Sequence, residues 1–105
     1  MQRISRSHFA FILIVLLAFA SAGCAKLKAR DFLNKGVAAY KAGNFDRAIE
    51  MFKQAKDADP TLLNAQIYLA TAYASQYIPG APSEDNVNKG QQAIAEFKAV
   101  LQADP

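Results

Sequence analysis

Two residue types able to do chemistry occur only once each in this 105-residue sequence, as Cys24 and His8. His8 precedes a long apolar run near the N-terminus, in a segment with the pattern of a removable leader. Without it the chain has no imidazole to act as a general base or to ligate a metal ion. A single thiol also excludes an internal disulfide framework and a cysteine-rich zinc site.

Carboxylates are the other candidates for acid–base chemistry. Asp57 and Asp59 lie near the predicted end of one helix, and Glu84 and Asp85 lie near the predicted start of another. Acidic residues at helix ends commonly cap the helix or face solvent. No glycine-rich phosphate loop follows a predicted strand. We therefore predict a non-enzymatic protein with no catalytic residue, no metal site and no cofactor.

The N-terminal segment has the order of a secretory signal peptide. Arg3 and Arg6 precede an unbroken apolar run over residues 9–20, and the small residues Ser21, Ala22 and Gly23 follow. A helix of this run covers about 18 Å, whereas a bilayer core is about 30 Å thick and takes about 20 residues. Removal of residues 1–23 is thus favoured over a permanent membrane span.

The residues around the predicted cut resemble the lipobox of bacterial lipoproteins, in the order Ser21-Ala22-Gly23-Cys24. In that family the Cys thiol receives a diacylglycerol and a peptidase cuts before it, which implies lipidation of Cys24. Ser21 departs from the family, which prefers Leu there. Two or three acyl chains, at about 0.8 kcal/mol per buried methylene, hold a protein stably on a membrane. The alternative is an ordinary cut near Ala20-Ser21-Ala22 that leaves Cys24 as a free thiol.

The residue after the cysteine bears on localisation. In many lipoproteins of bacteria with two membranes, Asp at this position retains the protein at the inner membrane, and here the residue is Ala25. The resemblance thus implies the outer membrane, facing the periplasm, with the inner membrane or a soluble periplasmic form as alternatives. Residues 24–28 form a short basic tether, which either lies against anionic headgroups or is a solvated linker.

Length and charge restrict the remaining chain to one small domain. Residues 24–105 carry ten basic and nine acidic side chains, so their net charge is close to zero. Nonspecific nucleic-acid binding requires a strongly basic surface. We therefore predict no nucleic-acid partner.

The sequence after the leader contains an internal repeat. The segment Ala48–Lys53 recurs as Ala93–Lys98, and Asp59-Pro60 recurs as Asp104-Pro105, with equal spacing inside both copies. Upstream residues align at an offset of 34 and these downstream segments at an offset of 45. The second copy therefore carries an 11-residue insertion, over about residues 77–88.

A 34-residue period with small and aromatic landmarks resembles the tetratricopeptide repeat. The landmarks of the first repeat, residues 29–62, are Gly36, Ala48, Phe52, Ala55 and Pro60, and those of the second, residues 63–105, are Leu69, Ala70, Tyr73, Ala93, Phe97 and Pro105. Phe32 stands where the family usually has Trp, and Lys35 where it usually has Leu. The resemblance implies an all-α solenoid of about two helical hairpins, preceded here by a hydrophobic signal helix.

Local patterns predict where these helices begin and end. Apolar residues recur at steps of three and four, the spacing of one helix face. Gly36 is expected to permit close approach of the second helix, and Gly43-Asn44 to end the first. The third helix is predicted from about Leu62 to Gln76, and Ser83 as the N-cap of the fourth. The insertion is thus a Pro-rich loop plus about two helical turns, either a partner-contact loop or a variation in length alone.

The resemblance also implies a binding surface, because the first helix of each tetratricopeptide hairpin lines a concave groove. The corresponding residues are Arg30, Leu33, Asn34, Val37, Tyr40 and Lys41 in the first repeat, and Asn64, Ile67, Tyr68, Thr71, Ala74 and Ser75 in the second. Leu33 and Val37 occupy two positions at which some members clamp a chaperone's terminal carboxylate, so that activity is not expected here. We predict a scaffold that binds an extended or helical peptide of a partner protein, with internal packing as the alternative role of Leu33 and Val37.

The C-terminal residues Asp104-Pro105 lie where a third repeat would begin. Phe97, Val100 and Leu101, on the far side of the fourth helix, would then lack a neighbour. We expect the sequence to be part of a longer array. The alternatives are a structural module that self-associates through its last helix, and an accessory domain of an enzyme that continues beyond residue 105.

Overall fold

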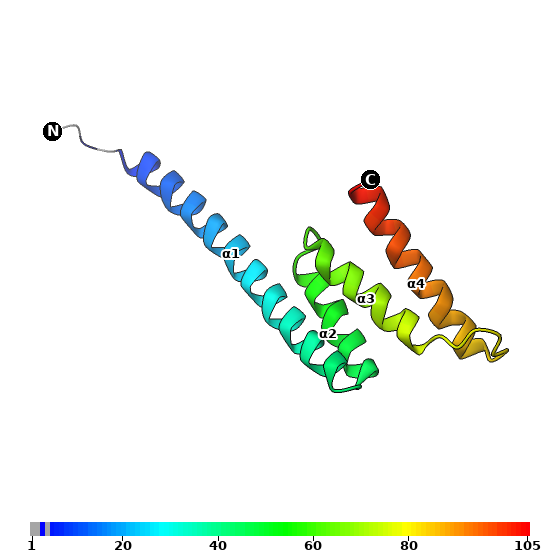
Figure 1. The fold of residues 1–105 in the computed structure, drawn as a ribbon. Coiled ribbons are helices and arrows are strands. Elements are labelled where there is room, and N and C mark those ends of the chain that lie inside the picture. Colours follow the sequence, from blue (N-terminus) through cyan, green and yellow to red (C-terminus); the bar gives the residue numbers. More distant parts are fainter. Residues whose placement is uncertain (1–2, 4) are drawn as a thin grey trace.

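The computed structural model describes residue 3 and residues 5–105. It contains four helices, α1 (Arg6–Lys41), α2 (Phe45–Ala58), α3 (Leu63–Gln76) and α4 (Glu84–Ala103), and no strand occurs in the part of the chain it describes. α1 and α2 form one antiparallel hairpin and α3 and α4 form the next, with α3 packed on α2 (Figure 1). The predicted all-α fold of two helical hairpins with a hydrophobic helix at the N-terminus is confirmed.

α1 is a single helix of 36 residues that joins the apolar segment to the first repeat. It extends far beyond the other helices in Figure 1, and the side chains of residues 9–20 are all exposed. The predicted cut between Gly23 and Cys24 lies inside this helix, and the predicted tether at residues 24–28 is helical rather than a loose linker. No proline interrupts residues 6–41, and Ala and Leu predominate between residue 9 and residue 29, so the local sequence favours continuation of the helix.

The predicted end of the first helix at Gly43-Asn44 is confirmed. α1 ends at Lys41 with Ala42 as its C-cap, and Gly43 adopts the left-handed conformation with φ of 79°. The backbone N–H groups of Gly43 and Asn44 donate to the last carbonyls of α1, at Tyr40 and Ala39. Asn44 also caps α2, because its Oδ1 accepts a hydrogen bond from the Arg47 backbone N–H.

The turn between α2 and α3 is built around Asp59. Its Oδ1 accepts hydrogen bonds from the Thr61 hydroxyl at 2.6 Å and from the Thr61 backbone N–H at 3.0 Å. The hydroxyl bond is the largest cause of a lowered pKa of Asp59, and the positive charges of Lys26 and Arg30 act in the same direction. Asp59 is the C-cap residue of α2, where its backbone N–H donates to the Ala55 carbonyl, and the predicted helix end before Pro60 is confirmed.

The core of the repeats lies where α1, α2 and α3 meet. Phe52 of α2 and Leu69 of α3 are its largest fully buried side chains. A Cβ at Gly36 of α1 would overlap the Phe52 ring, so the predicted close approach at this glycine is confirmed. Small residues let the helices approach closely elsewhere in the core, namely Ala29, Ala39, Ala48, Ala55, Ala65, Ala70, Ala72 and Ala93.

Candidate groove between α1 and α3

A hollow of about 420 Å³ opens between α1 and α3, over the middle of α2. α1 contributes Val37, Tyr40 and Lys41, and α3 contributes Ile67, Tyr68 and Thr71. All six are among the residues predicted to line a groove. The structure brings them together because the two helices lie side by side on α2 and turn the same face outward.

The floor of the hollow is Phe52, a landmark of the first repeat that was not among the predicted groove residues. Its ring is 1% exposed and stacks on Tyr68, with ring centroids 5.6 Å apart and planes inclined at 26°. Gly36 leaves the space into which this ring fits. The signal for this role is the pair of landmarks Gly36 and Phe52 at facing positions of adjacent helices.

Tyr40 is held in place on one side of the hollow. Its hydroxyl lies 2.8 Å from Ser75 Oγ, and its ring meets Phe45 edge to face at 5.2 Å. The Ser75 hydroxyl donates its only proton to the Thr71 carbonyl at 2.8 Å, so the Tyr40 hydroxyl is the donor in the pair. This contact links α1 to α3 across the groove and orders the tyrosine before any ligand arrives.

The other predicted groove residues do not line this hollow. Arg30, Asn34 and Asn64 are exposed outside it, and Arg30 contributes to the positive potential at Asp59. Leu33 packs against the core cluster, in agreement with its alternative role, whereas Val37 both packs and lines the hollow. Ala74 faces a different hollow, described next.

A second hollow, also of about 420 Å³, lies between α3 and α4 in the second hairpin. Its lining comes from the end of α3, the following loop and α4, namely Ala74, Tyr77, Val87, Gly90, Gln91, Ala93, Ile94 and Phe97. The Tyr77 ring covers Gly90, where a Cβ would lie 3.0 Å from it. Phe97 and Leu101 are exposed on α4, as predicted, whereas Val100 is half-buried and Ile94, which was not predicted, is exposed as well.

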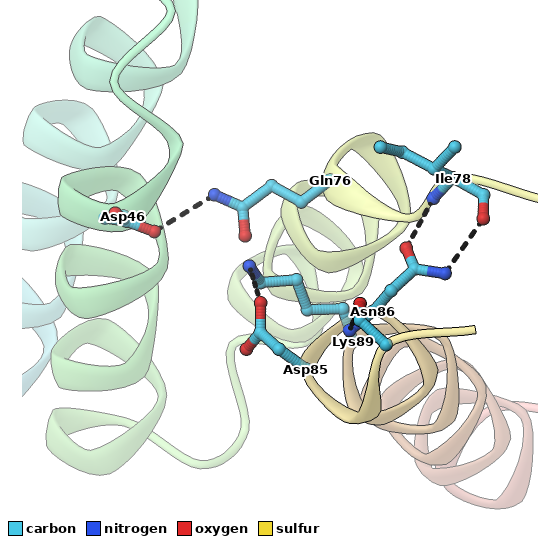
Figure 2. Close-up of polar contacts among 7 residues, drawn as sticks. Asp46, Gln76, Ile78, Asp85, Asn86 and Lys89 are labelled. Atoms are coloured by element: carbon cyan, nitrogen blue, oxygen red, sulfur yellow. Dashed lines mark hydrogen bonds and ion pairs between the residues drawn. The ribbon is translucent and has the colours of Figure 1, made fainter. Parts of the chain in front are cut away.

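The inserted loop beside this hollow is fixed by Asn86, whose side chain is buried (Figure 2). Its Oδ1 accepts from the Ile78 N–H at 2.7 Å, and its Nδ2 donates to the carbonyls of Ile78 and Ala81 at 2.8 and 3.0 Å. Ser83 caps α4 by accepting from the Asn86 N–H, so the predicted early start of this helix is confirmed. The loop therefore has one defined shape.

Two further contacts steady the same region. Gln76 at the end of α3 donates from Nε2 to Asp46 Oδ1 on α2 at 3.0 Å, and Lys89 pairs with Asp85 at 2.8 Å (Figure 2). The hydrogen bond to Asp85 raises the pKa of Lys89. The Lys89–Asp85 pair stabilises the first turns of α4, and the Gln76–Asp46 hydrogen bond connects the end of α3 to α2.

Replacing Asn86 with Ala is expected to loosen the loop while leaving the helices folded. The loss leaves the Ile78 amide and the Ala81 carbonyl without protein partners, whereas the Ile78 carbonyl still accepts from the Ala81 N–H at 3.2 Å. Buried groups that stay unpaired cost about 1–3 kcal/mol. Hydrogen–deuterium exchange at the Ile78 amide measures the effect. Asn88→Ala, two residues along the same helix at an exposed position, is the control and should leave that exchange rate unchanged.

Within the part of the chain that the structure describes, no His, Cys, Asp or Glu side chain lines the hollow between α1 and α3. No group of three His, Cys, Asp or Glu side chains placed to hold a metal ion occurs within residues 3 and 5–105. Cys24 and His8 both lie exposed on α1, apart from the hairpins. The lining of the hollow between α1 and α3 is mainly apolar and aromatic, with Lys41 and Thr71 as its polar members besides the two tyrosine hydroxyls.

Comparison with known proteins identifies the first hairpin. Residues 29–62 match the family model of the tetratricopeptide repeat, the range predicted for the first repeat. No curated protein and no solved structure matches the chain. The match supports a tetratricopeptide repeat protein and suggests a protein–protein interaction module. α1 is also long and apolar enough to cross a membrane, with a mean hydropathy of 2.2 over 18 residues, as a signal sequence near an N-terminus would be.

Proposed function

We propose that this protein is a non-enzymatic scaffold that binds a peptide segment of another protein in the groove between α1 and α3. The observation that carries the proposal is the ordered apolar hollow, lined from both repeats by six residues at the family's groove positions. Phe52 closes its floor, and Tyr68 is 42% exposed at its side. Concave apolar hollows with a few polar groups are typical ligand sites.

The proposed location is the bacterial outer membrane, facing the periplasm, with lipid on Cys24. Its support is the lipobox-like segment before Cys24, the exposed position of that thiol, and the exposed apolar side chains of residues 9–20. Intact-mass analysis of the membrane fraction tests it. We expect a chain that begins at Cys24 and carries diacylglycerol. A chain that retains residues 1–23, or an unmodified Cys24, would contradict the anchor.

Binding in the groove predicts a specific loss of affinity in one variant. Ile67→Arg places a charge at the partly exposed edge of the hollow and should weaken peptide binding at least tenfold, since apolar contact and shape are lost. The probe is a set of 12-residue peptides selected from a random display library on the full chain in mild detergent. Fluorescence anisotropy gives the dissociation constants.

The matched control is Ile94→Arg, which introduces the same charge on the exposed face of α4. It should leave the affinities within twofold of the unsubstituted chain. Selected peptides that bind the Ile67→Arg chain as tightly as the unsubstituted chain would refute the groove as the binding site, as would failure of the library to yield any binder.

A second candidate is self-association through α4, which the exposure of Ile94, Phe97 and Leu101 favours. Phe97 occupies the position in its repeat that Phe52 occupies in the first, yet Phe97 is 40% exposed and Phe52 only 1%. Sedimentation of the full chain in detergent would reveal a dimer that Ile94→Glu abolishes and Ala95→Glu preserves. A monomer at all concentrations would exclude this role.

A further inference from the structure

The hydrogen-bonding groups around the hollow bear on which conformation a bound peptide has. An extended peptide has unpaired backbone N–H and C=O groups, which need partners when they leave water. Grooves that take extended peptides commonly supply main-chain or side-chain hydrogen bonds along their length. The polar groups of this groove can be counted one by one.

Most of these groups are already engaged within the protein. The Tyr40 hydroxyl donates to Ser75, and the Ser75 hydroxyl donates to the Thr71 carbonyl. The Thr71 hydroxyl donates to the Ile67 carbonyl at 2.8 Å. The backbone groups of α3 along the hollow are bonded within their own helix, and the Tyr40 carbonyl near the end of α1 accepts from the Gly43 N–H at 3.0 Å. Among the lining residues this leaves the Tyr68 hydroxyl and the Lys41 ammonium as the side-chain donors that are not engaged within the protein.

The charge of the groove is concentrated at one residue. α3 contains no charged residue, and Lys41 is the one charged residue that lines the hollow. On α1, Asp31 pairs with Lys35 at 2.9 Å, away from the lining residues. Lys41 forms no ion pair within residues 3 and 5–105. The groove thus offers an apolar centre with one positive charge at the end nearer the α1–α2 turn.

We infer that the partner segment is an amphipathic α-helix whose apolar face enters the hollow and whose acidic residue meets Lys41. A helix satisfies its own backbone groups and needs from the groove only apolar contact and charge complementarity. Its anchors recur at three- and four-residue steps, because those positions share one helix face. This inference rests on the proposed function, since it specifies the ligand of the same groove.

Three fluorescent 15-residue peptides test the inference. The first, made of Leu, Ala, Gln and Glu, has Leu at steps of three and four and Glu beside the terminal Leu. The second has the same composition with Leu at alternate positions, the pattern of an extended strand. The third replaces Glu with Lys. Anisotropy is measured on the full chain in mild detergent, and binding to the Ile67→Arg chain under the same conditions is subtracted.

We expect the first peptide to bind at least tenfold more tightly than the second and to gain helical circular dichroism when bound. The third should bind more weakly than the first on the unsubstituted chain and more tightly than the first on the Lys41→Glu chain. Equal or tighter groove binding of the second peptide would overturn the helical inference and leave the proposed function standing. Equal binding of the first and third would overturn the acidic contact.

The same measurements separate this inference from the proposed function. If no peptide, including those selected from the display library, distinguishes the unsubstituted chain from the Ile67→Arg chain, the groove itself is refuted and the inference falls with it. If library peptides depend on Ile67 but contain proline or alternating apolar residues, only the helical inference is wrong. Circular dichroism of each chain variant, recorded without peptide, confirms that the substitutions leave it folded.

Discussion

Replacing Phe52 with Ala is expected to remove most of the stability of the two hairpins. Phe52 is 1% exposed, fills the space over Gly36 and stacks on Tyr68, so its loss empties the centre where three helices meet. Truncation of a buried Phe typically costs about 3–5 kcal/mol. That is a large part of the about 5–15 kcal/mol by which small domains are stable. The groove would lose its floor at the same time.

The measurement is urea unfolding of the full chain in mild detergent, followed by tyrosine fluorescence. All four tyrosines lie at residues 40–77 and the chain has no tryptophan, so the signal reports on the hairpins rather than on the apolar segment. Phe97→Ala is the matched control, because Phe97 occupies the equivalent position in the second repeat and is 40% exposed. It should cost about 1 kcal/mol or less, since partial burial gives less transfer free energy. Equal losses in both variants would refute the assignment of Phe52 as the central residue of the core.

Adding one methyl group at Gly36 is the second large effect expected. In Gly36→Ala the new Cβ would overlap two ring atoms of Phe52 and lie 3.1 Å from a third. Overpacking of a filled core costs about 1–3 kcal/mol, and the better helix propensity of Ala returns about 1 kcal/mol. We expect a net loss of up to about 2 kcal/mol in the free energy of unfolding, by the same urea assay.

Gly23→Ala is the control in the same helix, because a Cβ at Gly23 meets no atom within 4 Å. It should not lower the free energy of unfolding, because the better helix propensity of Ala acts at Gly23 without a clash. A second test uses Phe52→Leu, whose smaller side chain makes room for the new methyl group. Gly36→Ala should cost less in the Phe52→Leu background than alone, since residues in contact are not additive. Additive losses would mean that the methyl group is accommodated by movement of the backbone instead.

Features that depend on local sequence were predictable. The spacing of Ala48, Phe52 and Ala55 predicts a helix with one apolar face, and Ser83 followed by Glu84 and Asp85 predicts the start of another. Both agree with the structure. The glycine at residue 36 also predicted a close approach, because glycine within a helix lowers stability unless a neighbour uses the space.

Features that depend on contacts between distant residues were not predictable from spacing. Asn86 bonds Ile78, eight residues earlier in the chain. The spacing of apolar residues in a helix does not indicate that a polar residue such as Asn86 will be buried. Phe52 forms the groove floor because α1 and α3 flank it on either side. That arrangement depends on the angles between the helices, which residue spacing does not specify. The groove residues Arg30, Asn34 and Asn64 were placed by helix position alone, and the hollow is shorter than the face that they share.

The helical continuity of residues 24–28 differs from the expected tether for a local reason. The two lysines of residues 25–28 suggest a solvated or headgroup-bound tether because of their charge, but Ala, Leu and Lys also have high helix propensity. Charge indicates where a segment lies relative to water or headgroups, and propensity indicates its conformation. In this segment the charge and the propensity are compatible, because residues 24–28 form a mostly exposed, basic turn of helix.

Because α1 is unbroken, it fixes the direction in which the groove faces relative to Cys24. With 3.6 residues per turn and 1.5 Å per residue, each residue between Cys24 and Val37 turns the hollow by about 100° around the helix axis and moves it by about 1.5 Å along it. The number of residues in this segment thus sets the direction of the groove, whereas in a flexible linker it would change only the distance that the groove can move from Cys24. Inserting two alanines after Lys28 would point the groove almost the opposite way, and inserting seven would restore its direction about 10 Å farther out.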